Sequence, residues 1–126
     1  MALEIKINKK KNYVYFVELK GSVDSDTYHN LQEKLSEVID DNTKAVILDM
    51  GRVDYISSAG IGVVMSTKKS LQQKNANFAM VNLQPQIKKV FDVMKILPMI
   101  DILDDMPGAD KYIDQIIKEE IGKQAK

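Results

Sequence analysis

Two adjacent hydroxyl side chains, Ser57 and Ser58, lie between a short apolar segment and a segment with helical periodicity. The apolar segment is residues 45–50, and the helix is expected from about residue 59 to residue 74. A helix start leaves backbone N–H groups unpaired and carries partial positive charge, so it suits either a hydroxyl cap or a phosphate group. Capping and phosphate acceptance are therefore the two roles that this pair suggests.

Hydrolysis is a weaker alternative. The single histidine, His29, is expected on a different helix from the serines, and a Ser–His–Asp site needs its base within hydrogen-bond reach of the serine. The nucleophile-elbow pattern G-x-S-x-G is absent because position 56 is Ile. The sequence therefore predicts a protein that is not an enzyme.

Nucleotide binding has equally little support. Gly60-Ile61-Gly62 matches only the first three positions of G-x-G-x-x-G, and Met65 stands where the last glycine belongs. Each glycine costs about 1 kcal/mol against alanine inside a helix, so two in one turn need a reason. The two glycines could serve close packing against another element or an exposed docking face, and the sequence leaves both explanations open.

Metal-dependent chemistry is also disfavoured. One histidine and scattered carboxylates do not make a ligand cluster, and Asp104 and Asp105 are expected in a solvated turn. A receiver domain that accepts phosphate on Asp49 or Asp54 would need an acidic pair after the first two strands to hold Mg²⁺, and that pair is missing. With no cysteine, thiolate ligands are excluded. No metal or cofactor is expected.

The bulk composition indicates one small domain spanning residues 1–126, with 44% hydrophobic residues. Lys plus Arg and Asp plus Glu number 18 each, which argues against general binding to nucleic acid or anionic membranes. The N-terminus lacks the apolar core of a signal peptide, and no apolar run approaches the roughly 20 residues of a membrane span. A cytoplasmic location is expected.

Hydrophobic periodicity predicts alternating strands and helices. Strands are expected at residues 3–7, 13–19, 45–50, 77–83 and 99–103. Helices are expected at residues 28–39, from 59 to about 74, from Pro85 onwards, and around residues 112–121, where Tyr112, Ile113, Ile116, Ile117 and Ile121 share one side. Residues 9–12 are expected to form a polar turn, and Pro107 and Gly108 to mark another.

The resulting order is β-β-α-β-α-β-α-β-α. It predicts an α/β domain with a mixed, mostly parallel sheet of about five strands and about four helices, opened by an antiparallel hairpin. The last helix either packs on the sheet or takes part in dimerisation, and the protein is expected to be a monomer or a weak dimer.

Residues 49–64, DMGRVDYISSAGIGVV, resemble the signature of STAS domains, the family of anti-sigma factor antagonists. That signature reads roughly D-L-S-x-V-x-F-[ML]-D-S-[SAT]-G-[LI]-G-V-[LI]. The turn Gly21-Ser22-Val23-Asp24 resembles the family's G-E-L-D turn, and the order of elements also fits. The resemblance thus covers nearly the whole chain.

The resemblance implies that Ser58 is a phosphoacceptor. A serine kinase that is also an anti-sigma factor would phosphorylate it, a phosphatase would reverse this, and the unphosphorylated form would bind the kinase and free the sigma factor. The implied partner-binding surface comprises Ser22, Val23, Asp24, Ser57, Ala59, Gly60, Gly62 and Val63.

Two residues depart from the family pattern. Ser57 replaces the signature's Asp, and Ser22 replaces the Glu of the turn. The loss of a carboxylate beside the acceptor leaves three consequences open: weaker kinase recognition, a different partner, or Ser57 as the alternative acceptor. A phosphate-independent STAS interaction module in a transport or signalling assembly is the second functional hypothesis.

Overall fold

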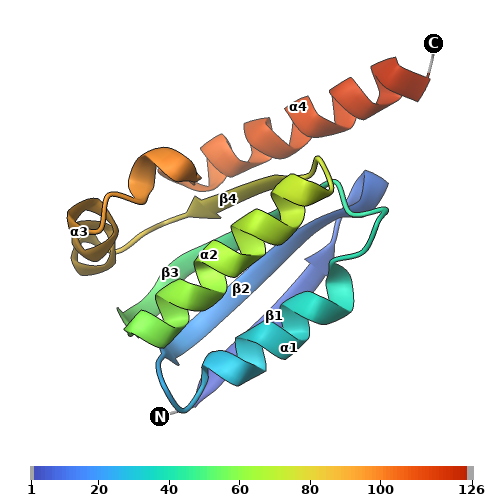
Figure 1. Ribbon diagram of the computed structural model, residues 1–126. Coiled ribbons are helices and arrows are strands. Elements are labelled where there is room, and N and C mark those ends of the chain that lie inside the picture. Colours follow the sequence, from blue (N-terminus) through green and yellow to red (C-terminus); the bar gives the residue numbers. More distant parts are fainter. Residues whose placement is uncertain (1, 125–126) are drawn as a thin grey trace.

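The computed structural model describes residues 2–124, with side chains for residues 2–119. Its centre is a five-stranded sheet in the order β1-β2-β3-β4-β5 (Figure 1). The strands are β1 (Leu3–Lys9), β2 (Val14–Val23), β3 (Ala45–Ile56), β4 (Asn77–Val81) and β5 (Asp101–Leu103). β1 pairs with β2 antiparallel, and the other neighbours pair parallel, which confirms the expected mixed sheet.

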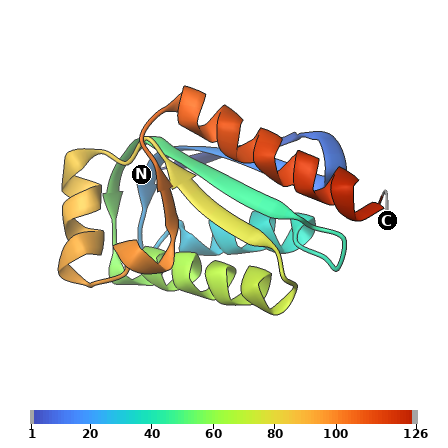
Figure 2. The same ribbon diagram turned by 90° about the horizontal axis from the view of Figure 1, so that it is seen from above.

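Helices cover both faces of this sheet. They are α1 (Tyr28–Val38), α2 (Ser58–Gln73), α3 (Pro85–Val93) and α4 (Met106–Gln124), with short 3₁₀ turns at η1 (Lys11–Tyr13) and η2 (Leu97–Met99). Figure 2 shows α1 and α2 on one face and α4 on the other. The order of elements is the predicted one. Within residues 2–124, no helix is both long and apolar enough to span a membrane.

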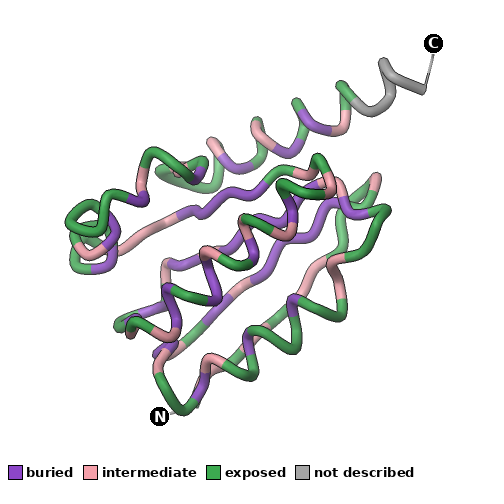
Figure 3. The backbone as a smooth tube through the Cα atoms, viewed as in Figure 1, coloured by how far each residue is buried: buried purple, intermediate pink, exposed green. Residues whose placement is uncertain are grey.

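Two apolar clusters hold the layers together, and the buried positions follow the strands and inner helix faces in Figure 3. The larger cluster joins the sheet to α1, α2 and α3 through residues such as Leu31, Val64 and Phe91. The second lies under α4, where Ala109, Ile113 and Ile116 pack on Val14, Phe16, Ala45, Ile47, Ala79 and Val81. The described part of the last helix therefore packs on the sheet. The side chain of Ile121 lies outside the described residues.

β3 is longer than the predicted strand at residues 45–50. It pairs with both neighbours only as far as Asp49, opposite Val81, and continues to Ile56 paired with β2 alone. In this extension Val53 and Ile56 are buried, while Arg52, Asp54 and Tyr55 are exposed. The predicted strand end at Met50 was wrong. The continuous run of apolar residues ends there because β4 no longer lies beside β3, but β3 itself continues.

The turn predicted at Pro107 and Gly108 was also wrong, since both residues belong to α4. Proline fits the first turn of a helix, where its missing N–H would be unpaired in any case. The Gly108 amide donates to Asp105 Oδ1 at 2.9 Å, so Asp105 caps the helix start. Smaller differences are the 3₁₀ turn η1 within the polar turn and the placement of Met99 in η2 instead of β5.

Candidate functional site

Ser57 fastens the end of β3 to the start of α2. Its amide donates to the Val23 carbonyl at 2.8 Å, and its own carbonyl accepts from the Ile61 amide at 2.9 Å. Its Oγ accepts from the Gly60 amide at 3.3 Å, which makes Ser57 the N-cap of α2. The backbone and the side chain of Ser57 are therefore both engaged in holding the helix start.

Ser58 is the first residue of α2, and its side chain is exposed. Among the described residues its hydroxyl has no hydrogen-bond partner, whereas the neighbouring Ser57 hydroxyl has one. The positive end of the helix dipole lies at the same place, and it favours negative charge. The structure thus separates the two serines into a cap and a free surface hydroxyl.

The two glycines of α2 differ in the space around them. A Cβ on Gly60 would lie 2.7 Å from both Ile56 Cγ1 and the Val23 carbonyl oxygen, so position 60 has no room for a side chain. A Cβ on Gly62 would meet nothing within 4 Å. Gly60 therefore allows α2 to pack closely on β2 and β3, and only Gly62 is open to a partner.

The turn that follows β2, at residues 24–27, lies beside the serines. The reason is that the last residues of β2 and β3 are paired, Ser22 with Tyr55 and Val23 with Ile56. In this turn Asp24 Oδ1 accepts from the amides of Asp26 and Thr27 at 2.9 and 3.1 Å. The bond from the Asp26 amide, and then those from the hydroxyl and amide of Thr27, lower the pKa of the Asp24 carboxyl below its ordinary value. Asp24 is thus a fixed, ionised group at the surface.

Ser22 lies in the last part of β2, directly before this turn. Its hydroxyl donates to Asp54 Oδ1 at 2.9 Å, and its carbonyl accepts from the Thr27 hydroxyl at 2.7 Å. With 1% of its surface exposed, Ser22 ties β2 to the extension of β3.

The residues expected at the partner-binding surface fall into two groups. Ser58 and Gly62 are exposed, and Asp24, Ser57 and Ala59 are partly exposed. Ser22, Val23, Gly60 and Val63 are buried, so they support the surface without offering side chains to a partner.

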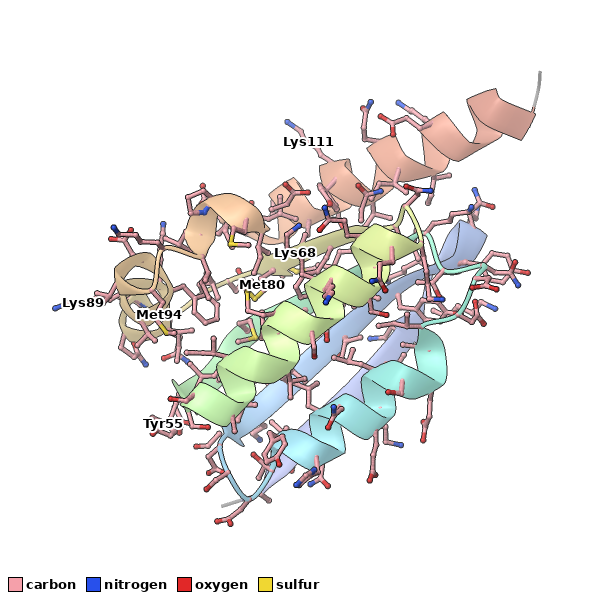
Figure 4. The ribbon with its side chains drawn as sticks, viewed as in Figure 1. Tyr55, Lys68, Met80, Lys89, Met94 and Lys111 are labelled. Carbon is pink, nitrogen blue, oxygen red and sulfur yellow. The ribbon has the colours of Figure 1, made fainter. Side chains whose placement is uncertain are left out.

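Sequence reasoning missed Tyr55, whose side chain is 56% exposed at the end of β3 (Figure 4). The sequence carries no strand signal here, because the buried residues Val53 and Ile56 are three positions apart and do not show the alternation with period two that marks a half-buried strand.

The residues considered for hydrolysis, for phosphate acceptance on aspartate and for metal binding have other surroundings. His29 is exposed on α1, with its ring centroid 3.8 Å from that of Tyr28. Asp49 Oδ1 accepts from the Gly51 amide at 3.0 Å and from Asn82 Nδ2 at 3.2 Å. In the described part of the chain no three His, Cys, Asp or Glu residues are grouped to hold a metal ion.

Comparison with known proteins fits this geometry. The model of the STAS domain matches residues 5–109, and the chain belongs to this family. The Bordetella bronchiseptica protein BtrV, by its name an anti-sigma factor antagonist, is 33% identical over 91 residues, covering 72% of this chain and 78% of BtrV. The anti-sigma-B factor antagonist of Staphylococcus epidermidis is 26% identical over 88 residues, covering 70% and 82%. The anti-sigma factor antagonists that this chain resembles are regulatory proteins and not enzymes.

The fold is that of SpoIIAA from Bacillus, which has been solved as an unphosphorylated anti-sigma factor antagonist and in a phosphorylated form. Both structures align with a TM-score of 0.72, at 18% and 19% identity respectively. The alignments cover 90% of this chain and 97% and 99% of the two SpoIIAA chains.

Proposed function

We propose that this protein is an anti-sigma factor antagonist switched by phosphorylation of Ser58. In its unphosphorylated form it binds an anti-sigma factor that is also a serine kinase, and the sigma factor is released. Phosphorylation of Ser58 by that kinase ends the interaction, and a serine phosphatase restores it. The protein acts in the cytoplasm, where its partners would be.

The observation that carries this proposal is the free, exposed hydroxyl of Ser58 on a firmly held helix start. A phosphate there adds about −1.5 to −2 charges and three acceptor oxygens next to unpaired backbone N–H groups. The helix end stabilises the added charge by ~0.3–1 kcal/mol, so modification changes the surface without unfolding the domain. The solved phosphorylated form of SpoIIAA is a precedent for phosphate on this fold.

Asp24 and Tyr55 give the same surface its recognition features. The ionised Asp24 offers a fixed negative charge to a basic group of the partner, and Tyr55 offers an exposed ring. A phosphate on Ser58 disfavours a partner that presents acidic or apolar groups to this hydroxyl, because like-charge contacts at an interface cost several kcal/mol and a charged group buried without a partner loses its hydration. The switch is therefore electrostatic and local.

Ser58 is favoured over Ser57 as the acceptor. The Ser57 hydroxyl accepts from the Gly60 amide, so a kinase would have to break the cap to reach it. Loss of an N-cap costs about 0.5–2 kcal/mol, and the Ser58 hydroxyl requires no such change.

The test is phosphorylation in vitro by the serine kinases encoded in the same genome, with the modified residue located by mass spectrometry. Phosphate should appear on Ser58 in the wild type and in Ser57→Ala, and on neither serine in Ser58→Ala. In a binding assay Ser58→Asp should weaken affinity for the kinase at least about tenfold, or ~1.4 kcal/mol, and Ser58→Ala should bind like the wild type.

No modification by any of these kinases, together with unchanged binding by Ser58→Asp, would rule out the switch. A phosphate-independent interaction module would then be the better description.

A further inference from the structure

Within residues 2–124, β1 has one side without a strand partner. It is the outer strand of the sheet, pairing with β2 along seven residues, and Figure 1 shows no strand beyond it. The strand at the opposite edge, β5, has only three residues. A short edge strand is one of the usual protections against pairing with another chain. β1 lacks this protection.

The backbone groups on the free side of β1 can be assigned from its pairing with β2. The Lys10 amide donates to the Val14 carbonyl at 2.7 Å, in the same register as Asn8 with Phe16. Hydrogen-bonded pairs alternate along an antiparallel ladder, so the even-numbered residues of β1 bond to β2. Leu3, Ile5 and Ile7 therefore direct their N–H and C=O groups away from the sheet.

The side chains of β1 are self-complementary about Ile5. Two copies of β1 aligned antiparallel on this residue place Glu4 opposite the partner's Lys6, and Lys6 opposite the partner's Glu4. On the other face Leu3 meets the partner's Ile7, and Ile5 meets its own counterpart. Opposite charges and paired apolar side chains are the cross-strand contacts that stabilise sheets.

The two adjacent registers fit less well. Pairing centred on Glu4 or on Lys6 would place two like charges directly opposite each other, and like charges in this position destabilise a sheet. It would also require backbone groups that already bond to β2. The register centred on Ile5 uses only the free groups.

The apolar side of the edge has room for a partner. Leu3, Ile5 and Ile7 are half-buried and pack against the larger core cluster. Leu3 and Ile5 also line a shallow groove with Asn30, Glu33, Lys34 and Glu37 of α1. Because α1 lies on one face of the sheet, as Figure 2 shows, the edge itself remains uncovered.

We propose that two copies of this chain associate through their β1 strands, in the antiparallel register centred on Ile5, to form one continuous ten-stranded sheet. Ile5 bonds to Ile5 across the two-fold axis, and Leu3 to Ile7 on either side of it. The two copies point in opposite directions, so the Ser58 surfaces lie at opposite ends of the joined sheet. The association is independent of the phosphorylation proposed above.

Charge reversal at the edge tests this association in the full-length chain. Sedimentation velocity over a concentration series should show a dimer for the wild type. Glu4→Lys and Lys6→Glu each place like charges opposite each other in both symmetric contacts. Each should raise the dimer dissociation constant about tenfold, which corresponds to ~1.4 kcal/mol.

The double exchange Glu4→Lys/Lys6→Glu is the matched control, since it restores opposite charges between the copies. Within one copy, however, Glu4 pairs with Lys20 and Lys6 with Glu18, so the same exchange places like charges there. Edge pairing predicts that the double variant regains the wild-type dissociation constant. If the effects instead arise within one chain, the double variant should have the highest dimer dissociation constant of the three variants. That result would overturn the proposal.

Hydrogen exchange locates the interface. The amides of Leu3, Ile5 and Ile7 should become more protected as the wild-type concentration rises, whereas those of Glu4 and Lys6 already bond to β2. A wild type that remains monomeric at every concentration, or a dimer in which these three amides stay unprotected, would contradict pairing through β1.

Discussion

Ser57 and Ser58 are adjacent, yet their hydroxyl groups have different surroundings. Ser57 Oγ accepts from the Gly60 amide, while the Ser58 side chain points to solvent at the first helical position. Neighbouring residues at a helix start differ in this way because the N-cap residue has an extended backbone that directs its side chain onto the amides of the first turn.

Replacing Ser57 by alanine should therefore lower the free energy of unfolding by about 0.5–2 kcal/mol through loss of the cap. Ser57→Asp should keep the wild-type value, since aspartate is an equally good cap. Ser58→Ala is the matched control and should change stability little, because no contact is lost. Urea denaturation followed by circular dichroism measures all three. Equal destabilisation by the two alanine variants would refute the assignment of Ser57 as the cap.

Gly60 and Gly62 form a second matched pair. Gly60→Ala should destabilise the protein by about 1–3 kcal/mol, because the new methyl group would overlap Ile56 and the Val23 carbonyl. Gly62→Ala should stabilise it by up to ~1 kcal/mol, since alanine is the better helix former and its side chain enters open space. The same denaturation experiment reports both values, and effects of equal sign would contradict the packing described for α2.

Among the elements, α4 is joined to the sheet edge by a polar contact as well as by its apolar side chains. The Tyr112 hydroxyl donates to Asp101 Oδ2 at 2.7 Å, linking α4 to β5. Burial, and then the bond to the Asp101 carboxylate, raise the pKa of Tyr112 well above its ordinary value. The folded protein thus holds the phenol proton more tightly than the unfolded chain does.

This difference predicts a loss of stability in alkali. The contribution of Tyr112 is fully present below its unfolded pKa of about 10 and declines as the pH rises above that value. Tyr112→Phe should be less stable than the wild type at neutral pH, and the gap should narrow above pH ~10. Free energies of unfolding measured against pH for both proteins provide the test. A gap that stays constant with pH would contradict it.

The sequence predicted an element well where the apolar pattern of its own residues is enough to define it. Strand β2 has apolar residues on both faces, and it is interior as expected. The extension of β3 was missed because it pairs with β2 alone and lacks a continuous apolar run. The start of α4 was missed because a proline followed by a glycine usually indicates a turn. Ser57 and Ser58 were placed correctly at the helix start. The burial of Ser22 was not predicted, and the sequence left close packing of Gly60 as one of two alternatives, because both depend on contacts between distant segments.

Considered as a whole molecule, the domain has one sheet face that carries α1 and α2 and another that is partly covered by α4. α4 shields the apolar cluster around Phe16 and Ile47. Beside it lies a shallow polar pocket, whose charged lining residues are Glu4, Lys6, Glu18, Lys20, Asp49 and Arg52. The change from apolar to charged side chains along β2 marks the border of the helix.

A chain ending at Asp105 should therefore expose the α4-covered cluster. We expect it to bind an apolar dye such as anilinonaphthalene sulfonate and to aggregate, because large exposed apolar patches drive association. Ile113→Ala in the full chain is the milder comparison and should cost about 2–5 kcal/mol without dye binding. A truncated chain that stays monomeric and does not bind the dye would show that the second face is stable without α4.

The capping role of Ser57 has a consequence for how members of the STAS family can differ from one another. Serine and aspartate cap helices about equally well, so the fold is nearly indifferent to which of them stands at position 57. The exchange changes the charge beside the Ser58 hydroxyl by one unit at almost no cost in stability. Specificity depends on differences in affinity between competing partners, and a residue of this kind changes those differences directly. Position 57 is thus a place where STAS domains can diverge in partner choice while the fold stays the same.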